Sequence, residues 1–496
     1  MRKSVRYVFL LLLLSSWTAS AGDKRTLTLR QAVEIARDSS LSTLRHHNIY
    51  AAEYWQWRTY KANRLPSLSL DLTPVQYNRF ITQRYNYDEN IDVFRPQQLF
   101  LASGRLNLAQ NVDFIGGTLY LESDLEYMRN FGGVTSNQFS AIPVRIGYSQ
   151  QLIGYNAFKW DRKIEPLKYE KAEKELISNM ETVSVEVAEL FFDLALAQTE
   201  YRLAVENVAS CDTLYAVGER RFMIAAISQD ELLTLRLDKV NAVNSLENAR
   251  IGLKKKMFAL ASYLGLDKDT EIEVQIPGRP SVVEIPMDRA LENARRHNPE
   301  LIGQQEAILK AQQQVSKTGA EKRFNASMNI SVGFNQIAPT LPQAYRNLLQ
   351  QDIVSVGLSI PLVDWGVRKG QHNMAKNNLN AAEISARQSE LQLEQEVMMT
   401  VNDFHTQGRL IESAQEALDL ADRAYGQTQQ RFMIGKADIN SLTLSRNRQQ
   451  EASRNYISVL QNYWTNYFKI RKLTLYDFES DRPVTIGSDN IIGMRR

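Results

Sequence analysis

The sequence predicts a mixed, mainly α-helical protein with a smaller set of β-strands, built from two tandem structural repeats. Two long tracts carry no proline, between Pro166 and Pro277 and between Pro361 and Pro483, and both are rich in good helix formers. Four short segments instead alternate apolar and polar residues, which is the period of a β-strand. Residues of the first half recur in the second half at a constant spacing, which indicates duplication.

Each proline-free tract has an apolar stripe at spacings of three and four residues, typical of helices that pack on other helices as coiled coils. Val183, Val187 and Leu190 lie on the first stripe, and Val397 and Val401 lie on the second. We therefore expect a long helix and a shorter returning helix in each repeat. The expected ranges are about 156–222 and 228–264 in the first repeat, and about 366–432 and 438–473 in the second.

The alternating segments lie at residues 67–72, 144–148, 327–332 and 354–358. An outer-membrane strand has one face against lipid and one against a wet lumen, which gives this pattern, and the edge of a soluble sandwich gives it too. Four strands cannot close a barrel alone. If these strands span a membrane, the chain must therefore oligomerise.

The repeat is most visible where Arg221-Phe222-Met223-Ile224 matches Arg431-Phe432-Met433-Ile434, an offset of 210 residues. Near the start of each copy, Ala32 matches Ala290 at an offset of 258. The two offsets differ by 48, which places a 48-residue insertion in the first repeat. It is expected as an extra hairpin or loop between strands at about 67–77 and 142–152. The strands of the second repeat are expected at about 325–335 and 352–362.

The first 21 residues are typical of a secretory signal peptide. Arg2 and Lys3 open a positive segment, an apolar run follows, and Ala19-Ser20-Ala21 resembles a cleavage site. The run is too short to span a bilayer. The remaining organisation is predicted as repeat 1 at 22–276, a proline-containing linker at 277–286, repeat 2 at 287–478 and a polar C-terminal tail at 479–496.

Composition excludes several classes of function. The net charge is +3, with 59 basic and 56 acidic residues, which gives no basis for binding nucleic acid. The single cysteine, Cys211, excludes an internal disulfide and thiolate metal clusters. His46 and His47 are adjacent and point apart, so they do not predict a metal site. We expect no cofactor, no metal and no enzymatic activity.

In its order of motifs the chain resembles the TolC family of outer-membrane efflux and export ducts, from Thr26 to Phe478. The resemblance rests on the leading helix Leu29-Arg30-Gln31-Ala32-Val33, the strand pairs, the two Arg-Phe turns and Leu264-Gly265-Leu266. It implies a homotrimer with a long antiparallel coiled-coil α-barrel and a shared 12-stranded transmembrane β-barrel, four strands per chain. The implied location is the cell outer membrane of a Gram-negative-type bacterium, in contact with outer-membrane lipid and with a large periplasmic part.

The implied function is the outer-membrane channel of a tripartite efflux system. Such a channel passes small toxic compounds from an inner-membrane pump, of RND type or an ABC exporter, and a periplasmic adaptor. One alternative is the outer-membrane duct of a type I protein secretion system. A periplasmic adaptor is less favoured, because adaptors normally have one helical hairpin and this sequence predicts two.

In the family, adaptors dock at the turns between the long and returning helices. Here these turns contain the following candidate docking residues: Ile224, Ala225, Ala226, Ile434, Gly435 and Lys436. Gly435 suits a helix end with positive φ, whereas Ala225 does not, so the first turn is expected to differ in shape. Charges near the turns are either gate residues between chains or simply solvated, namely Arg221, Asp230, Glu231, Arg431, Asp438 and Arg446. Where the family often has acidic residues after the second turn, this chain has Ser441 and Leu444.

Overall fold

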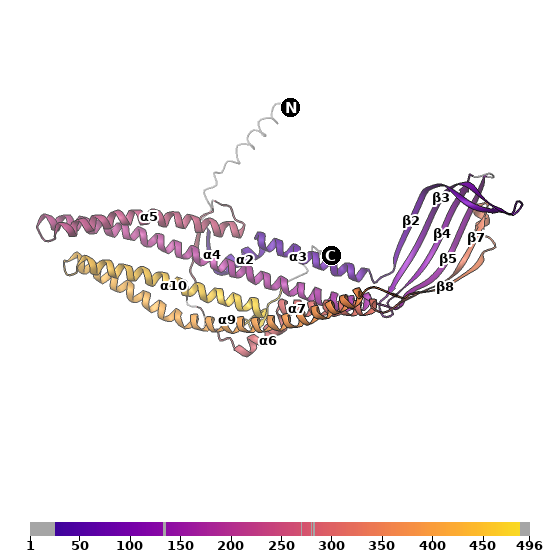
Figure 1. Cartoon of the computed structure of the whole chain (residues 1–496). Coiled ribbons are helices and arrows are strands. Elements are labelled where there is room, and N and C mark those ends of the chain that lie inside the picture. Colours follow the sequence, from indigo (N-terminus) through magenta and orange to yellow (C-terminus); the bar gives the residue numbers. More distant parts are fainter. Residues whose placement is uncertain (1–24, 132–134, 269, 279, 281–282, 487–496) are drawn as a thin grey trace, which may run out of the picture. The chain divides into compact units, whose positions relative to one another are not determined.

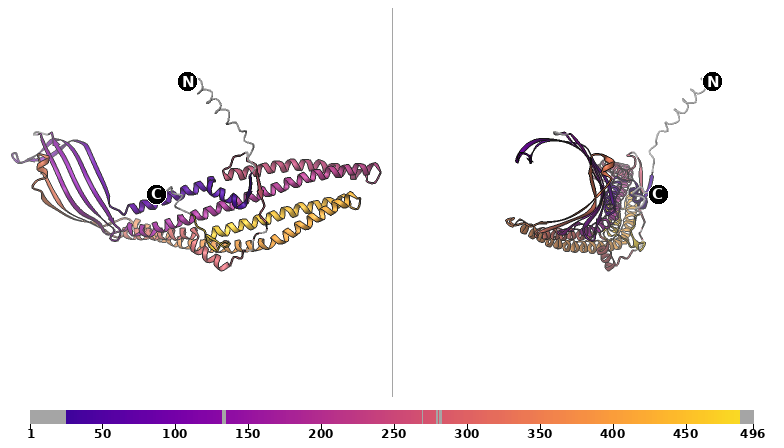
Figure 2. Two further views of the ribbon diagram at one scale, coloured as in Figure 1. Left: turned by 180° about the vertical axis from the view of Figure 1, so that it is seen from behind. Right: turned by 90° about the vertical axis from the view of Figure 1, so that its right-hand side faces the viewer.

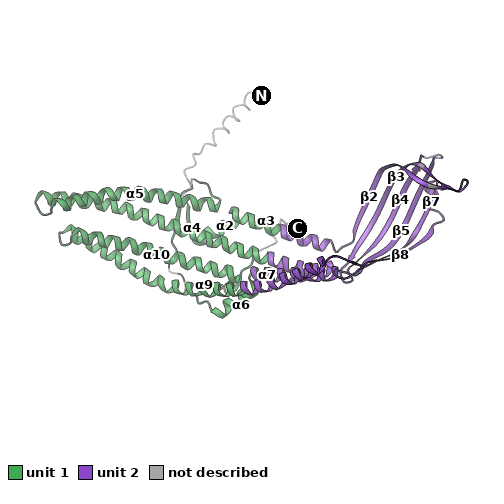
Figure 3. Ribbon diagram, in the orientation of Figure 1, with its two compact units in different colours: residues 1–51, 173–299, 390–496 green, residues 52–172, 300–389 purple. Residues whose placement is uncertain are grey.

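The computed structural model describes residues 25–131, 135–268, 270–278, 280 and 283–486, and it divides into two units (Figure 3). Unit 1 comprises residues 1–51, 173–299 and 390–496, and unit 2 comprises residues 52–172 and 300–389. The predicted signal peptide and the last ten residues of the predicted tail lie outside the described residues. In the part of the chain that is described, no helix is both long and apolar enough to cross a membrane.

Each repeat contributes one long helical hairpin, as Figure 1 shows. The four helices are α4 (Ala157–Met223), α5 (Gln229–Leu264), α9 (Val367–Met433) and α10 (Ile439–Thr474). The two long helices have 67 residues each, which at about 1.5 Å per residue is about 100 Å. The prediction of a mainly helical chain with long antiparallel helix pairs plus strands is confirmed.

The apolar stripes of the long helices form the core of unit 1. Phe191 and Leu194 of α4 are fully buried, and so is Val401 of α9. Phe404 of α9 stacks on Tyr463 of α10, with ring centroids 4.6 Å apart. Burial of such side chains stabilises the fold by about 1.5–3 kcal/mol each. The stripe that predicted the helices is therefore also the surface that joins them.

Short helices precede the strands in each repeat. They are α2 (Leu29–Ser39), α3 (Leu41–Ala62), α6 (Met287–His297) and α7 (Pro299–Glu321). The junction between each pair meets the end of a returning helix: Ser39 Oγ donates to the carbonyl of Leu264 over 3.2 Å, and Asn298 Nδ2 donates to that of Leu473 over 3.1 Å. These bonds satisfy carbonyl groups that a helix end leaves without a partner. Strand β1 (Arg25–Thr28) pairs in parallel with β6 (Ile272–Gln275), and β9 (Tyr476–Asp477) pairs with β10 (Arg482–Pro483).

A buried carboxylate ties three helices of unit 1 together. Glu181 of α4 is fully buried, and its Oε1 accepts from Arg37 of α2 at 2.6 Å and from Arg471 of α10 at 3.0 Å. Arg471 also lies 3.3 Å from Asp477. A charge removed from water is tolerated when it is paired and hydrogen-bonded in this way.

The strands of unit 2 form one antiparallel sheet in the order β2-β3-β4-β5-β7-β8. Their bounds are β2 (Ser67–Asn86), β3 (Ile91–Val112), β4 (Gly117–Asn130), β5 (Ser136–Ile153), β7 (Asn325–Ala338) and β8 (Leu349–Ser359), with the short helix α8 (Leu341–Ala344) between the last two. The described residues thus place six strands in this sheet, whereas the sequence predicted four strands and an extra hairpin or loop. The 48-residue insertion supplies β3 and β4. Strand β3 pairs with β2, β3 and β4 pair with each other, and β4 pairs with β5, so the insertion adds two strands to the middle of the sheet.

The sheet has one apolar and one polar face, and β3 and β4 follow the same division. Cross-strand partners on the apolar face include Leu70 with Leu106, Leu108 with Leu121, Leu121 with Ile146, Ile146 with Val332 and Ile330 with Val354. On the polar face Arg105 of β3 pairs with Glu122 at 3.0 Å and with Asp124 at 2.8 Å, both on β4. Glu122 also accepts from Arg145 of β5 at 2.7 Å. The inserted strands thus carry the charged pairs of the polar face.

Candidate functional site

The turns that end α4 and α9 have the same hydrogen-bonded geometry. The N–H of Ala226 donates to the carbonyl of Arg221 over 2.8 Å, and the N–H of Lys436 donates to that of Arg431 over 2.8 Å. One residue earlier, the N–H groups of Ala225 and Gly435 donate to carbonyls three residues back. These two nested bonds form a Schellman motif, which closes a helix when the residue after its cap is left-handed.

The left-handed residue is Ala225 in the first turn, with φ 51°, and Gly435 in the second, with φ 78°. The expectation that Ala225 would give the first turn a different shape is therefore wrong. Alanine in this region costs about 1–2 kcal/mol, and glycine avoids this cost. The hydrogen bonds on both sides of the turn hold Ala225 in the strained conformation.

The returning helices begin with matching caps. Ser228 Oγ accepts from the N–H of Glu231 over 3.2 Å, and a carboxylate oxygen of Glu231 accepts from the N–H of Ser228 over 3.0 Å, which is a capping box. Asp438 caps α10 by accepting from the N–H of Ser441 over 2.6 Å, and this bond lowers the pKa of the Asp438 carboxyl. Glu231 and Asp438, two of the predicted gate charges, thus form hydrogen bonds that cap the start of their own returning helices.

Arg221 joins the two hairpins. Its Nη2 donates to the carbonyls of Phe432 and Met433 over 3.0 Å each, and its guanidinium lies 5.5 Å from the centre of the Phe432 ring. A cation suits the C-terminus of α9, where carbonyl groups lack helical partners. Arg431, the equivalent residue of the second repeat, instead lies 3.4 Å from the carbonyl of Lys436 in its own turn.

The other two predicted gate charges differ from each other. Arg446 donates to Asn207 Oδ1 over 2.9 Å and lies 3.7 Å from the sulfur of Cys211. Arg446 therefore links α10 to α4 within the chain. Asp230 is exposed, and its carboxylate forms no ion pair or hydrogen bond with a described residue.

An apolar cluster lies beneath the turns and joins the hairpins. Leu214 and Leu235 come from the first hairpin, and Phe432 and Leu442 come from the second. A hollow of about 610 Å³ beside this cluster is lined mainly by polar groups of both turns, including Arg221. The two turns are thus held together as one surface at the end of the helical unit.

Apolar side chains are exposed at the outer end of this surface. Met223 is 79% exposed, Ile224 is 75% exposed and Ile434 is 67% exposed. Met223 and Ile224 are consecutive in the first turn and Ile434 lies in the second turn, so each turn ends in an exposed apolar tip. Contiguous exposed apolar groups of this kind mark sites of protein–protein contact.

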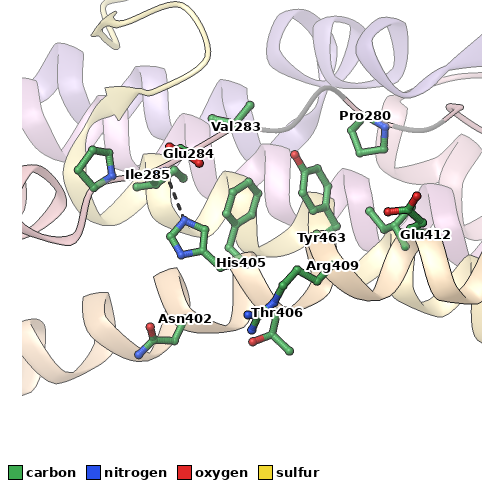
Figure 4. A pocket seen from close by; sticks show the side chains of 14 residues that line it. Pro280, Val283, Glu284, Ile285, Asn402, His405, Thr406, Arg409, Glu412 and Tyr463 are labelled. Atoms are coloured by element: carbon green, nitrogen blue, oxygen red, sulfur yellow. Dashed lines mark hydrogen bonds between the residues drawn. The ribbon is translucent and has the colours of Figure 1, made fainter.

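A second hollow, of about 840 Å³, lies where the linker crosses the second hairpin (Figure 4). His405 Nε2 accepts from the N–H of Ile285 over 3.3 Å, which fastens the linker to α9. Phe404 and Tyr463 also line this hollow. In the described ranges no cluster of three or more His, Cys, Asp and Glu side chains is arranged to hold a metal ion. His405 therefore has a structural partner in the linker.

Sequence reasoning located both turns and their charges but missed the contact between them. Arg221 donates to main-chain carbonyls more than two hundred residues away, and a main-chain acceptor leaves no trace in residue types. The burial of Phe432 was not predicted either. Its repeat equivalent Phe222 has the same sequence neighbours, so the local sequence cannot distinguish the two phenylalanines. The only sequence signal for a contact between the turns was the repeat itself, which places both turns at the same point of the two hairpins.

Comparisons with solved structures find the same fold in known proteins. The chain is similar to the CmeC outer membrane channel of Campylobacter jejuni, with a TM-score of 0.65 and 14% identity over 94% of this chain and 88% of that one. It is also similar to the outer membrane protein VceC of Vibrio cholerae, with a TM-score of 0.63 and 14% identity over 90% of this chain and 95% of that one. A membrane protein from Pseudomonas aeruginosa gives a TM-score of 0.64 and 14% identity over 90% of each chain. Comparison with curated protein sequences gives no match.

Residues 290–474 match the family model described as outer membrane efflux protein. This match covers the second repeat and agrees with the resemblance of the chain to the TolC family of outer-membrane efflux channels. The match and the similar structures agree with the predicted location in the outer membrane of a Gram-negative-type bacterium.

Proposed function

We propose that the chain is the outer-membrane duct of a tripartite efflux system and passes small toxic compounds. In this proposal an inner-membrane pump, of RND type or an ABC exporter, and a periplasmic adaptor deliver the compounds. The observation that carries the proposal is the pair of matching, capped turns with exposed apolar tips at Ile224 and Ile434. Exposed apolar groups that lie together in this way favour contact with a partner protein.

The working unit in this proposal is a homotrimer, as in the channels of this family. The two repeats support it. Phe432 is 5% exposed because the first hairpin of the same chain covers it, whereas its equivalent Phe222 is 42% exposed. In a closed ring of hairpins, the second hairpin of a neighbouring copy would cover Phe222 in the same manner. Trimerisation thus supplies the contact that one chain lacks.

The adaptor in this proposal contacts the six turn residues predicted from the sequence: Ile224, Ala225, Ala226, Ile434, Gly435 and Lys436. Three of the predicted gate charges already have partners within the chain through caps or helix contacts, namely Glu231, Asp438 and Arg446. Arg221 joins the hairpins of one chain. Arg431 has only a long main-chain contact within its own turn, so Arg431 and the exposed Asp230 are the charges most available for contacts between chains.

The test replaces both apolar tips with a charge. The double variant Ile224→Asp, Ile434→Asp places two carboxylates where an apolar adaptor surface would bind, and we expect it to restore sensitivity to bile salts, dyes and antibiotics to the level of a deletion strain. The matched control Ile224→Leu, Ile434→Leu keeps the apolar surface and should remain resistant. Both purified proteins should have the mass of three chains.

The outcomes separate the candidate functions. A charged-tip variant that keeps full resistance and cross-links normally to the adaptor would contradict docking at the turns. A deletion strain with unchanged sensitivity that no longer secretes a polypeptide would replace efflux with the type I secretion duct. A purified protein with the mass of one or two chains would overturn the homotrimer.

A further inference from the structure

We propose that each chain contributes all six strands of its sheet to the membrane, so that a trimer encloses an 18-stranded barrel instead of one with 12 strands. The inference rests on the homotrimer proposed above. Its subject is the inserted pair β3 and β4, which would span the membrane and contact lipid on one face.

The first argument is the pairing of the inserted strands. Strand β3 pairs with β4 without interruption from Leu99 opposite Asn130 to Val112 opposite Gly117. Over the same band β3 also pairs with β2, and β4 also pairs with β5. A membrane-spanning strand needs about 9–11 residues, and this band of β3 and β4 is longer. Removing β3 and β4 from the sheet would break hydrogen bonds along both of their edges.

The second argument is the apolar face. Leu106 of β3 and Leu121 of β4 are exposed in the single chain, as are Leu70 of β2 and Val354 of β8. They lie on the same face of the sheet, because their registers connect through cross-strand partners. If the inserted hairpin stood in water, its row of leucine side chains, which continues the row of the neighbouring strands, would be exposed to solvent. Lipid gives every strand of the row the same surroundings.

The third argument is the polar face of the same strands. Arg105, Glu122, Asp124 and Arg145 form linked ion pairs there, across β3, β4 and β5. Charged groups inside a membrane protein face a water-filled interior and pair with one another. The inserted strands therefore have the alternation of a barrel wall, with lipid on one side and a wet lumen on the other.

The fourth argument is closure. In the described residues β2 pairs with β3 alone and β8 pairs with β7 alone, so each is an edge of the sheet. Because the six strands alternate in direction, β2 and β8 are antiparallel, and β8 of one copy can continue the ladder at β2 of the next. The sheet is bent into an open arc, as the right-hand view of Figure 2 shows. Three copies of a six-stranded sheet then give 18 strands and leave no open edge.

The consequence is a wider pore through the membrane. For strands about 4.8 Å apart and tilted by about 40°, an 18-stranded barrel has a backbone diameter of about 36 Å, against about 24 Å for 12 strands. The lumen would be lined by three copies of the ion-paired cluster. The difference is large enough to see by electron cryo-microscopy of the trimer in lipid nanodiscs, where we expect 18 strands.

A labelling experiment tests the placement of β3 directly. In a Cys211→Ser background, single cysteines at Leu106 and at its neighbour Asn107 receive a nitroxide label in the purified, bilayer-reconstituted protein. We expect the label at residue 106 to collide with oxygen dissolved in lipid and the label at 107 with a water-soluble nickel chelate. Cysteines at Leu70 and Asp71 of β2 are the matched control pair and should behave in the same way.

A deletion tests the strand count. Removing residues 88–135 joins β2 to β5 with the strand directions preserved, and we expect a trimer whose barrel has 12 strands and a diameter reduced by about a third. If the label at 106 is as accessible to nickel as the label at 107 while the Leu70 and Asp71 pair separates as expected, the 18-stranded barrel is wrong and the homotrimer stands. An intact protein without the mass of three chains would overturn the homotrimer and the closure together.

Discussion

Replacing Gly435 with alanine tests how much the second turn depends on its left-handed residue. At φ 78° any side chain is strained, and a Cβ built on Gly435 lies 3.2 Å from Nη2 of Arg221. The backbone change costs about 1–2 kcal/mol. The close approach also pushes Arg221 away from the two carbonyls that it binds, so the total is at the upper end of that range.

This cost should be visible as local opening. One to two kcal/mol corresponds to about a 5–30-fold change in the ratio of closed to open turn. Native-state hydrogen exchange measured on a peptide covering residues 430–442 should therefore become faster by about 30-fold, the upper end of this range, because the N–H of Lys436 loses protection. Gly435→Val should exchange faster still, since a β-branched residue is more restricted.

The first turn supplies the control, since Ala225 already occupies the same conformation. Ala225→Gly removes strain but adds chain entropy in the unfolded state, and these effects are of similar size. We expect its exchange to change less than about threefold. Combining Gly435→Ala with Arg221→Ala separates strain from crowding by a double-mutant cycle. Unchanged exchange in Gly435→Ala would refute the reasoning.

Two further predictions concern buried and capping carboxylates. Glu181→Ala leaves Arg37 and Arg471 without their shared partner and should lower the free energy of unfolding by about 3–5 kcal/mol. The loss should be visible as a lower thermal unfolding temperature, and it should be smaller for Glu181→Gln. A Glu181→Ala variant as stable as the unmodified protein would contradict the network. The folded pKa of Asp438 is lowered, so its stabilisation is complete above its ordinary pKa and is lost as pH falls through the lower folded value. Hydrogen exchange at the start of α10 should accelerate below about pH 4, beyond the intrinsic rate, but not in Asp438→Asn.

The sequence was sufficient where structure follows from local periodicity. The apolar stripes through Val183 and Val397 predicted the long helices because a spacing of three and four leaves only one packed solution, a helix against a helix. The offset of 210 residues then predicted that both turns lie at equivalent points. These features depend on neighbours in the chain, and one sequence contains them in full.

The strand count failed because pairing in a sheet is not local. The insertion was expected as an extra hairpin or loop, but the partners of its strands lie in β2 and β5, and no residue within the insertion indicates them. The duplication also contributed to the wrong strand count, because any segment that the second repeat lacks was interpreted as an insertion and not as part of the sheet. The prediction for Ala225 was wrong for a related reason, because the surrounding hydrogen bonds outweigh the conformational preference of a single residue.

The open edges of the six-stranded sheet have a consequence for the chain before it assembles. A newly exported copy carries unpaired N–H and C=O groups along β2 and β8, next to a broad surface of leucine, valine and isoleucine. Such an edge accepts any passing strand, including a misaligned one. The two inserted strands enlarge this apolar surface, so in the proposed trimer the yield of finished protein would depend on how soon a second copy covers it.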